Sequence, residues 1–152
     1  MEPVRVLFVC VHNSARSQMA EAFLKCFGKG DFIVESAGLK PGVLNPYVVR
    51  AMAEVGVDIS ANRTKSVQEF LDKENEFDYV ITVCDEANAQ KCPVFPGGGK
   101  RLHWGFPDPS AIRGREEDIM KEVRKIREAI REKVLDWMAT LKEGEGYERA
   151  AE

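Results

Sequence analysis

The stretch that decides the fold reads VRVLFVCVHNSARS and spans residues 4–17. Its first part, Val4–Val9, is apolar apart from one arginine, and such a run is typical of a central strand in a parallel sheet. From Ser14 to Phe27 the apolar residues follow a helical period, and Gly28 is well placed to end that helix. A buried strand that leads through a short loop into a helix predicts the start of an α/β fold.

Outward from this stretch the chain keeps alternating between strand and helix patterns. Further strands are expected at Phe32–Ser36, Tyr79–Val83 and Arg101–Trp104, and a loop at Pro93–Gly99. Helices are expected from the Asn45-Pro46 cap to about Val55, over Ser66–Leu71, and along the amphipathic pattern Ile119, Val123, Ile126, Ile130, Val134, Trp137 and Leu141. This alternation predicts right-handed βαβ units and an α/β three-layer sandwich with a parallel sheet.

Length and composition exclude several classes of protein. The 152 residues suggest one domain, which we expect at 1–142 with a frayed polar tail at 143–152. A net charge of −3 provides no global basic field for nucleic acid or an anionic membrane, and no apolar stretch reaches the roughly 18 residues of a membrane span. Met1–Cys10 resembles a strand more than a signal peptide, so we expect a cytoplasmic protein, and a monomer because no large apolar stripe is evident.

The loop that follows the first strand has the composition of an oxyanion cradle. A Cys and an Arg five residues apart are common by chance, but these two lie between a buried strand and a helix, where backbone N–H groups converge on an anion. We expect the anion to be bound by Val11, His12, Asn13, Ser14, Ala15, Arg16 and Ser17. Arg16 can bind two oxygens with its planar fork, and the helix N-terminus and Arg16 both favour a thiolate at Cys10. Cys10 is then a nucleophile aimed at the bound oxyanion.

Other chemistry-bearing residues follow the later strands. Cys84 comes after the third expected strand and Asp108 after the fourth, and sites in parallel sheets lie at the carboxyl ends of strands. Each candidate catalytic residue also has a simpler interpretation. Cys10 can be a buried thiol, Cys84 and Cys92 can be unrelated thiols, and Asp108 can be a turn residue. His12 is interpreted as a loop residue, because a preformed thiolate needs no base, and Cys26 as a core thiol. The cysteine and histidine spacing does not favour zinc, and we expect neither metal nor cofactor.

Longer matches make the sequence similar to the low-molecular-weight protein tyrosine phosphatases and, more closely, to the thioredoxin-coupled arsenate reductases of that superfamily. They include Asn13–Glu21, Ser36–Gly38, Asn45-Pro46, Val55–Ser60, Val83–Asp85, Cys92-Pro93 and His103–Pro109, and the resemblance covers roughly residues 4 to 142. It implies a flavodoxin-like fold with a four-stranded parallel sheet.

The resemblance also implies a mechanism. Cys10 attacks arsenate while Asp108 protonates the leaving oxygen. Cys84 then attacks Cys10 and arsenite leaves, and Cys92 attacks Cys84 to give a disulfide that thioredoxin reduces. The alternatives are a phosphatase that hydrolyses phosphate monoesters through a Cys10 phosphocysteine, an activity that can also accompany reduction weakly, and a non-enzymatic oxyanion sensor.

Two features bear on the choice between reductase and phosphatase, namely the extra thiols and the residues beside Asp108, and two concern the geometry of a Cys84–Cys92 disulfide. A phosphatase has no use for two further thiols, whereas a reductase must deliver two electrons. Residues 85–91 have modest helix tendency, and a helix there would hold the two sulfurs more than about 10 Å apart, so a disulfide requires unwinding. That spacer has seven residues where many relatives of this family have six. The absence of tyrosine beside Asp108 argues against phosphotyrosine as a substrate.

A lysine stands where some reductases of this group bind potassium. Residues matching Asn13, Glu21 and Ser36 form that cation site together with an Asp, and here the Asp is replaced by Lys65. We expect the Lys65 ammonium to pair with Glu21 and to make potassium unnecessary.

Overall fold

The structure is a computed structural model of the whole chain, and it describes residues 2–72, 76–95 and 99–143. A four-stranded parallel sheet is built from β1 (Val4–Cys10), β2 (Phe32–Gly38), β3 (Tyr79–Thr82) and β4 (Lys100–His103), in the order β2-β1-β3-β4. The predicted α/β fold with a four-stranded parallel sheet is therefore confirmed. The predicted tail beyond Glu143 and residues 96–98 of the predicted loop lie outside the described residues.

The central position of β1 in the sheet explains why its sequence is apolar apart from Arg5. It pairs with β2 from Val4↔Phe32 to Cys10↔Gly38, and with β3 from Val6↔Tyr79 to Val9↔Thr82. Its side chains alternate between the two faces, so Val6 and Phe8 join one hydrophobic cluster while Leu7 and Val9 join the other. A strand buried on both faces cannot show the polar alternation of a half-exposed strand.

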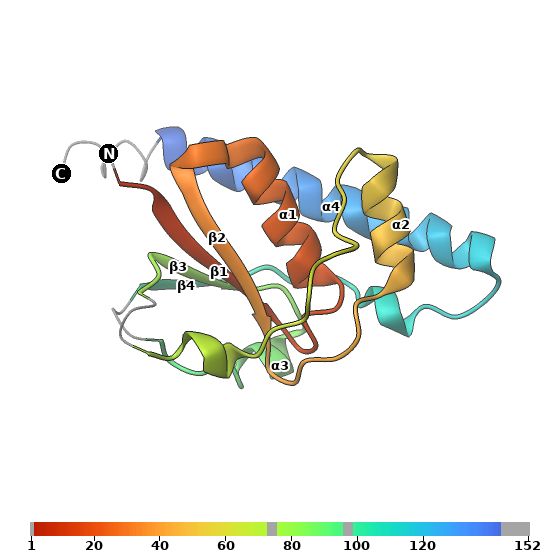
Figure 1. Cartoon of the computed structure of the whole chain (residues 1–152), viewed down its shortest axis with the longest axis horizontal. Coiled ribbons are helices and arrows are strands. Elements are labelled where there is room, and N and C mark those ends of the chain that lie inside the picture. The colour runs from red at the N-terminus through yellow and green to blue at the C-terminus, as the bar shows by residue number, and fades with distance from the viewer. Residues whose placement is uncertain (1, 73–75, 96–98, 144–152) are drawn as a thin grey trace.

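Three helices cover one face of the sheet (Figure 1). They are α1 (Arg16–Gly28), α2 (Pro46–Glu54) and α4 (Glu116–Glu143). The predicted cap of α2 is present, because the Asn45 side chain accepts hydrogen bonds from Tyr47 N and Val48 N. Along α4 the predicted stripe is buried except at its start, where Met120 is buried and Ile119 is only partly buried.

The opposite face has a thinner cover. It consists of the 3₁₀ turn η2 (Val67–Phe70), capped by Ser66, and of aromatic side chains that include Phe77 and Phe95. A four-residue helix, α3 (Glu86–Ala89), follows β3, and two further 3₁₀ turns, η1 (Lys29–Asp31) and η3 (Pro109–Ala111), lie in the described residues. No helix in the described residues is both long and apolar enough to cross a lipid bilayer.

The strand order places a site at one edge of the sheet. The chain runs from β1 to β2 on one side, and β3 and β4 lie on the other side of β1. The segments that leave β1 and β3 therefore diverge at the carboxyl edge, which is where open α/β sheets bind their ligands.

Candidate active site

The segment that joins β1 to α1, residues 10–17, has the carbonyls of residues 10–15 fixed by hydrogen bonds; we call it the cradle loop. Six successive carbonyls each accept a hydrogen bond. The donors to residues 10 through 15 are, in order, Leu39 N, Lys40 N, Gly42 N, Gln18 Nε2, Asn45 N and Met19 N. A loop whose carbonyls are bound from outside turns its N–H groups toward the concave side, and Asn13 N accordingly donates to Cys10 Sγ at 3.2 Å.

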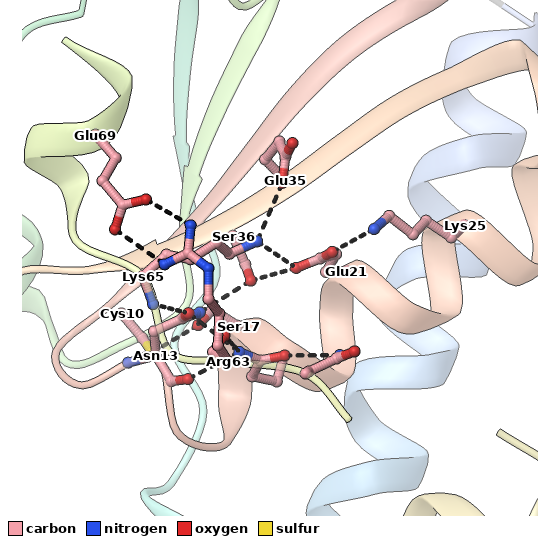
Figure 2. Close-up of polar contacts among 12 residues, drawn as sticks. Cys10, Asn13, Ser17, Glu21, Lys25, Glu35, Ser36, Arg63, Lys65 and Glu69 are labelled. Carbon is pink, nitrogen blue, oxygen red and sulfur yellow. Dashed lines mark hydrogen bonds and ion pairs between the residues drawn. The ribbon is translucent and has the colours of Figure 1, made fainter. Parts of the chain in front are cut away.

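Asn13 organises the interior of this loop. It adopts a left-handed backbone conformation with φ of 53°, which Asn tolerates better than most residues. Its side-chain Nδ2 donates to Ser17 Oγ at 2.7 Å and to Ser36 Oγ at 2.9 Å, and its Oδ1 accepts from the backbone N of Lys65 (Figure 2). Because Asn13 is fully buried and bonded on every side, the loop has one well-defined shape.

The sulfur of Cys10 lies at the centre of these contacts. Ser17 Oγ is 2.8 Å from Cys10 Sγ, a distance at which the hydroxyl can donate to the sulfur. Both side chains are buried, and Asn13 Nδ2 donates to the same hydroxyl oxygen from the other side. The hydroxyl is therefore held in place against the sulfur.

Gly38 allows the loop to approach β2. A Cβ at this position would lie 2.8 Å from three backbone atoms of the loop: Val11 O, His12 C and Asn13 N. Backbone atoms cannot move aside as a flexible side chain can, so any larger residue here would displace the cradle loop.

Arg16 and Asp108 meet at the mouth of the loop. Arg16 is buried and its Nη1 donates to Phe106 O at 3.1 Å, while Nη2 lies 4.0 Å from Asp108 Oδ2. The Asp108 side chain is 41% exposed, and its Oδ1 caps η3 by accepting from Ser110 N. Fold and contacts thus bring a guanidinium and a carboxyl group, predicted from separate parts of the sequence, to one place.

Cys84 lies within electrostatic reach of the same groups. It is fully buried in the cluster that also contains Cys10. Burial raises the pKa of the Cys84 thiol to about 11, and the charge of Arg16 opposes that rise. The structure therefore gathers Cys10, Arg16, Cys84 and Asp108 at the carboxyl edge of the sheet.

Cys92 is not part of this group. It is buried at 7% exposure in the cluster on the opposite face of the sheet, together with Val80, Phe77 and Phe95. Burial raises the pKa of its thiol, and Arg101 opposes the rise by charge and hydrogen bonding. The two candidate relay thiols thus lie on different faces of the sheet. We call residues 84–92, which carry both thiols and α3, the relay segment.

The prediction for Cys26 is wrong. Its side chain is exposed, because the buried side of α1 runs through Met19, Ala20, Phe23 and Leu24. The pattern was misassigned by one position, since Cys and Leu have similar apolar character and only packing against α4 and the sheet fixes the rotation of the helix.

Lys65 forms the ion pair that the sequence predicted. Its Nζ lies 3.5 Å from Glu21 Oε1 and 3.0 Å from Glu35 Oε1, with only 13% of the side chain exposed. Ser36 Oγ donates to Glu21, and Ser36 also accepts from Asn13 (Figure 2). This places an ammonium at the end of a hydrogen-bond chain that starts at Cys10.

His12 lies on the exposed outer side of the loop. Its Nδ1 is 2.8 Å from Lys40 O, and its ring packs beside Gly42. In the part of the chain that the structure describes, no three His, Cys, Asp or Glu side chains gather as metal ligands would.

Sequence reasoning missed the residues that support the loop from behind. Gln18 is buried and donates to the carbonyl and the side chain of Asn13 and to Arg63 O, and Asn62 in turn donates to Gln18 Oε1. Asn45 was recognised only as a helix cap, although its backbone N also holds Ser14 O. A glutamine immediately before the apolar face of the helix was the available signal, since a buried amide requires partners.

Comparisons with known proteins identify the family and its relatives. Residues 5–146 match the model of the low molecular weight phosphotyrosine protein phosphatase family. The chain is 41% identical over 140 residues to an arsenate reductase of Bacillus subtilis, covering 92% of this chain and 99% of that protein. It is 42% identical to an arsenate reductase of Shouchella clausii, covering 82% and 88%. A solved structure described as an arsenate reductase in the oxidized state superposes with a TM-score of 0.75 at 30% identity, covering 93% and 99%.

Proposed function

This chain belongs to the low molecular weight phosphotyrosine protein phosphatase family, and within it we propose that the protein is an arsenate reductase that works by a three-thiol relay. The observation that carries the proposal is the burial of a second thiol, Cys84, beside the nucleophile Cys10 and the anion-binding Arg16. The two relatives named as arsenate reductases, similar over more than four fifths of this chain, support the choice of substrate.

The first step builds an arsenic–sulfur bond. Arsenate sits in the cradle loop, held by the inward N–H groups and the Arg16 fork. Cys10 Sγ attacks arsenic, an oxygen leaves as water, and Asp108 supplies the proton that this oxygen needs. The 4.0 Å separation of Arg16 and Asp108 supports this role, because the acid stands next to the group that binds the anion.

The second and third steps move the electrons. Cys84 attacks Cys10 Sγ, the electron pair of the S–As bond passes to arsenic, and arsenite leaves with arsenic reduced from the +5 to the +3 state. Cys92 then attacks Cys84 Sγ and expels Cys10 as a thiolate. The product is a Cys84–Cys92 disulfide, which an external dithiol reduces. We propose thioredoxin as that donor, and a reducing cytoplasm with a monomeric enzyme as its setting.

Serine variants of the relay thiols test this function. Cys84→Ser should release no arsenite, because the arsenic adduct on Cys10 cannot be resolved. Cys92→Ser should release one equivalent per chain and then stop with a Cys10–Cys84 disulfide. Both variants should keep hydrolysing p-nitrophenyl phosphate. Cys26→Ser is the matched control, since this thiol is exposed and outside the relay. Multiple-turnover arsenate reduction in both relay variants would refute the relay.

The electron donor is tested separately. Arsenate-dependent NADPH consumption is compared with thioredoxin and thioredoxin reductase, and with glutathione, glutaredoxin and glutathione reductase. Faster consumption with the glutathione system would overturn the thioredoxin proposal and leave arsenate reduction intact.

The Lys65 ion pair supports activity without potassium. The Lys65 ammonium already pairs with Glu21 and Glu35, and Lys25 pairs with Glu21 as well, so a metal cation would have to displace an ammonium. Activity is expected to be equal in KCl and NaCl at the same ionic strength. A steep rise specific to potassium would contradict this.

A second function from the same family, phosphate monoester hydrolysis, shares the cradle loop and Asp108. Pro107 and Pro109 flank that acid, Phe106 lies two residues before it, and none of residues 106–110 is a tyrosine. We therefore propose only weak phosphatase activity, with no preference for phosphotyrosine over simple phosphate esters.

A further inference from the structure

Cys92 has to leave a buried position before the last exchange of the relay. Its thiol belongs to the cluster on the face of the sheet opposite to Cys84, packed with Val80, Phe77 and Phe95. Disulfide formation requires the two Cα atoms within about 7 Å and the two sulfurs in contact. Whatever holds Cys92 in place therefore controls the step that completes the relay.

The bonds inside the relay segment are local and few. Asp85 caps α3 by accepting from Asn88 N, and Lys91 N and Cys92 N donate to Asn88 O and Ala89 O. A helix of four residues has little cooperativity of its own, so these bonds open easily. They tie the segment to itself, and its contact with the sheet comes from the packing of Ala89 and Cys92 and from Arg101.

Arg101 ties the end of the segment to the sheet. Its Nη1 donates to Pro93 O at 2.9 Å and its Nη2 to Cys92 O at 3.2 Å. The planar guanidinium therefore bridges two successive carbonyls, which fixes the direction of the backbone at Cys92. Arg101 itself is held by the pairing of β4 with β3, where it lies opposite Val80.

We propose that Arg101 is a positioning residue that retains Cys92 on the far face of the sheet and limits the rate at which Cys92 reaches Cys84. The proposal rests on the relay described under the proposed function. When Cys92 moves toward Cys84, the carbonyls of Cys92 and Pro93 must leave the guanidinium. A consequence is that the idle enzyme resists closing the Cys84–Cys92 disulfide before arsenate has reacted.

The experiment measures closure of this disulfide without arsenate. The background is Cys10→Ser with Cys26→Ser, so that Cys84 and Cys92 are the remaining thiols of the chain. Diamide is added as the two-electron oxidant, samples are quenched with acid and an alkylating reagent, and the Cys84–Cys92 disulfide is quantified by mass spectrometry.

Arg101→Met removes both donors and keeps an apolar stem of similar length. Two hydrogen bonds from a charged donor are lost, so closure should accelerate about tenfold. Arg101→Lys keeps the charge and can reach one carbonyl at a time, so its closure rate should lie between those of the background and of Arg101→Met. This partial rescue separates positioning from general loosening of the fold, which the melting temperature reports.

Arg113→Met is the matched control. Arg113 is also exposed and also donates to two carbonyls, those of Ser110 and Ile112, but it lies in the turn after Asp108 and away from Cys92. Its closure rate should equal that of the background.

Two outcomes overturn the proposal in distinguishable ways. Because Arg101 also lowers the pKa of Cys92, closure rates are compared per Cys92 thiolate, from pH profiles of each variant. If the disulfide then forms equally fast or more slowly in Arg101→Met, Arg101 does not restrain Cys92, and the relay itself stands. If no Cys84–Cys92 disulfide forms in any variant, the relay fails as well.

Discussion

The cradle loop and the relay segment both leave central strands at the same edge of the sheet, β1 and β3, yet they are built differently. The cradle loop has six fixed carbonyls and a buried Asn13 bonded on every side. The relay segment has a four-residue helix, an exposed cap and its two thiols on opposite faces of the sheet.

This difference fits the roles that we propose for the two regions. Binding a tetrahedral anion requires donors already in place, because donors that must reorganise give up part of their binding energy. Passing a disulfide between separated sulfurs requires a backbone that moves. The comparison therefore predicts that substitutions in the loop affect all chemistry, whereas substitutions in the segment affect only thiol exchange or local motion.

The largest effect is expected at Cys10, the proposed nucleophile. Cys10→Ser should lower both arsenate reduction and p-nitrophenyl phosphate hydrolysis by at least about 10³-fold, since an alcohol is a far weaker nucleophile than a thiolate. Initial rates of both reactions, with the melting temperature as a check on folding, test this. Retention of either activity would contradict the proposal that both reactions use Cys10 in the cradle loop.

The next effect is expected at Arg16. Arg16→Lys keeps the positive charge but loses the fork that binds two oxygens, so kcat/KM should fall about 10²-fold for both arsenate and the phosphate ester. Arg124→Lys is the control, since Arg124 makes a comparable two-oxygen contact with Glu54 on the exposed surface. Loss of one activity alone would show that the loop serves the two anions differently.

The rate of the step in which Cys84 attacks is expected to rise about tenfold per pH unit. Its pKa of about 11 leaves little thiolate at neutral pH, so the Cys84 step should accelerate with rising pH until that value is approached. A chain with Cys84 as its sole cysteine, titrated by thiolate absorbance, should show a midpoint well above that of the same chain in urea.

The raised pKa of Cys84 also makes the free energy of unfolding depend on pH. The folded pKa of Cys84 is above its ordinary value of 9.0, so the stabilising contribution is complete below about pH 9 and is lost as the pH rises through about 11. A folded midpoint at or below the unfolded one would contradict the burial of Cys84.

The smallest effect is expected at the cap of α3. Asp85→Ala removes the acceptor for Asn88 N, which costs about 1 kcal/mol locally, and amide exchange over residues 86–91 should accelerate about fivefold. The melting temperature should stay unchanged, because so short a helix opens independently of the core. A large fall in melting temperature would instead show that the relay segment unfolds together with the core.

The sequence predicted the fold well because its strongest signals are local or periodic. The apolar run Val4–Val9, the Asn45-Pro46 cap and the stripe along α4 each follow from backbone geometry, and all three are present. Cys26 was misplaced because the rotation of α1 depends on two neighbours at once, the sheet and α4, which no local pattern records.

For the site, the sequence by itself determined which candidate residue types are present: a thiol and an arginine at a strand–helix junction, an acid after a later strand, and two more cysteines. The tertiary structure decided how they are arranged. It placed Cys84 beside Cys10 and Cys92 on the opposite face, made Gln18 and Gly38 supports of the loop, and set Arg101 against the carbonyls of Cys92 and Pro93. The physical reason is that reactivity is encoded in single side chains, whereas burial and distance arise only when segments far apart in the chain pack together.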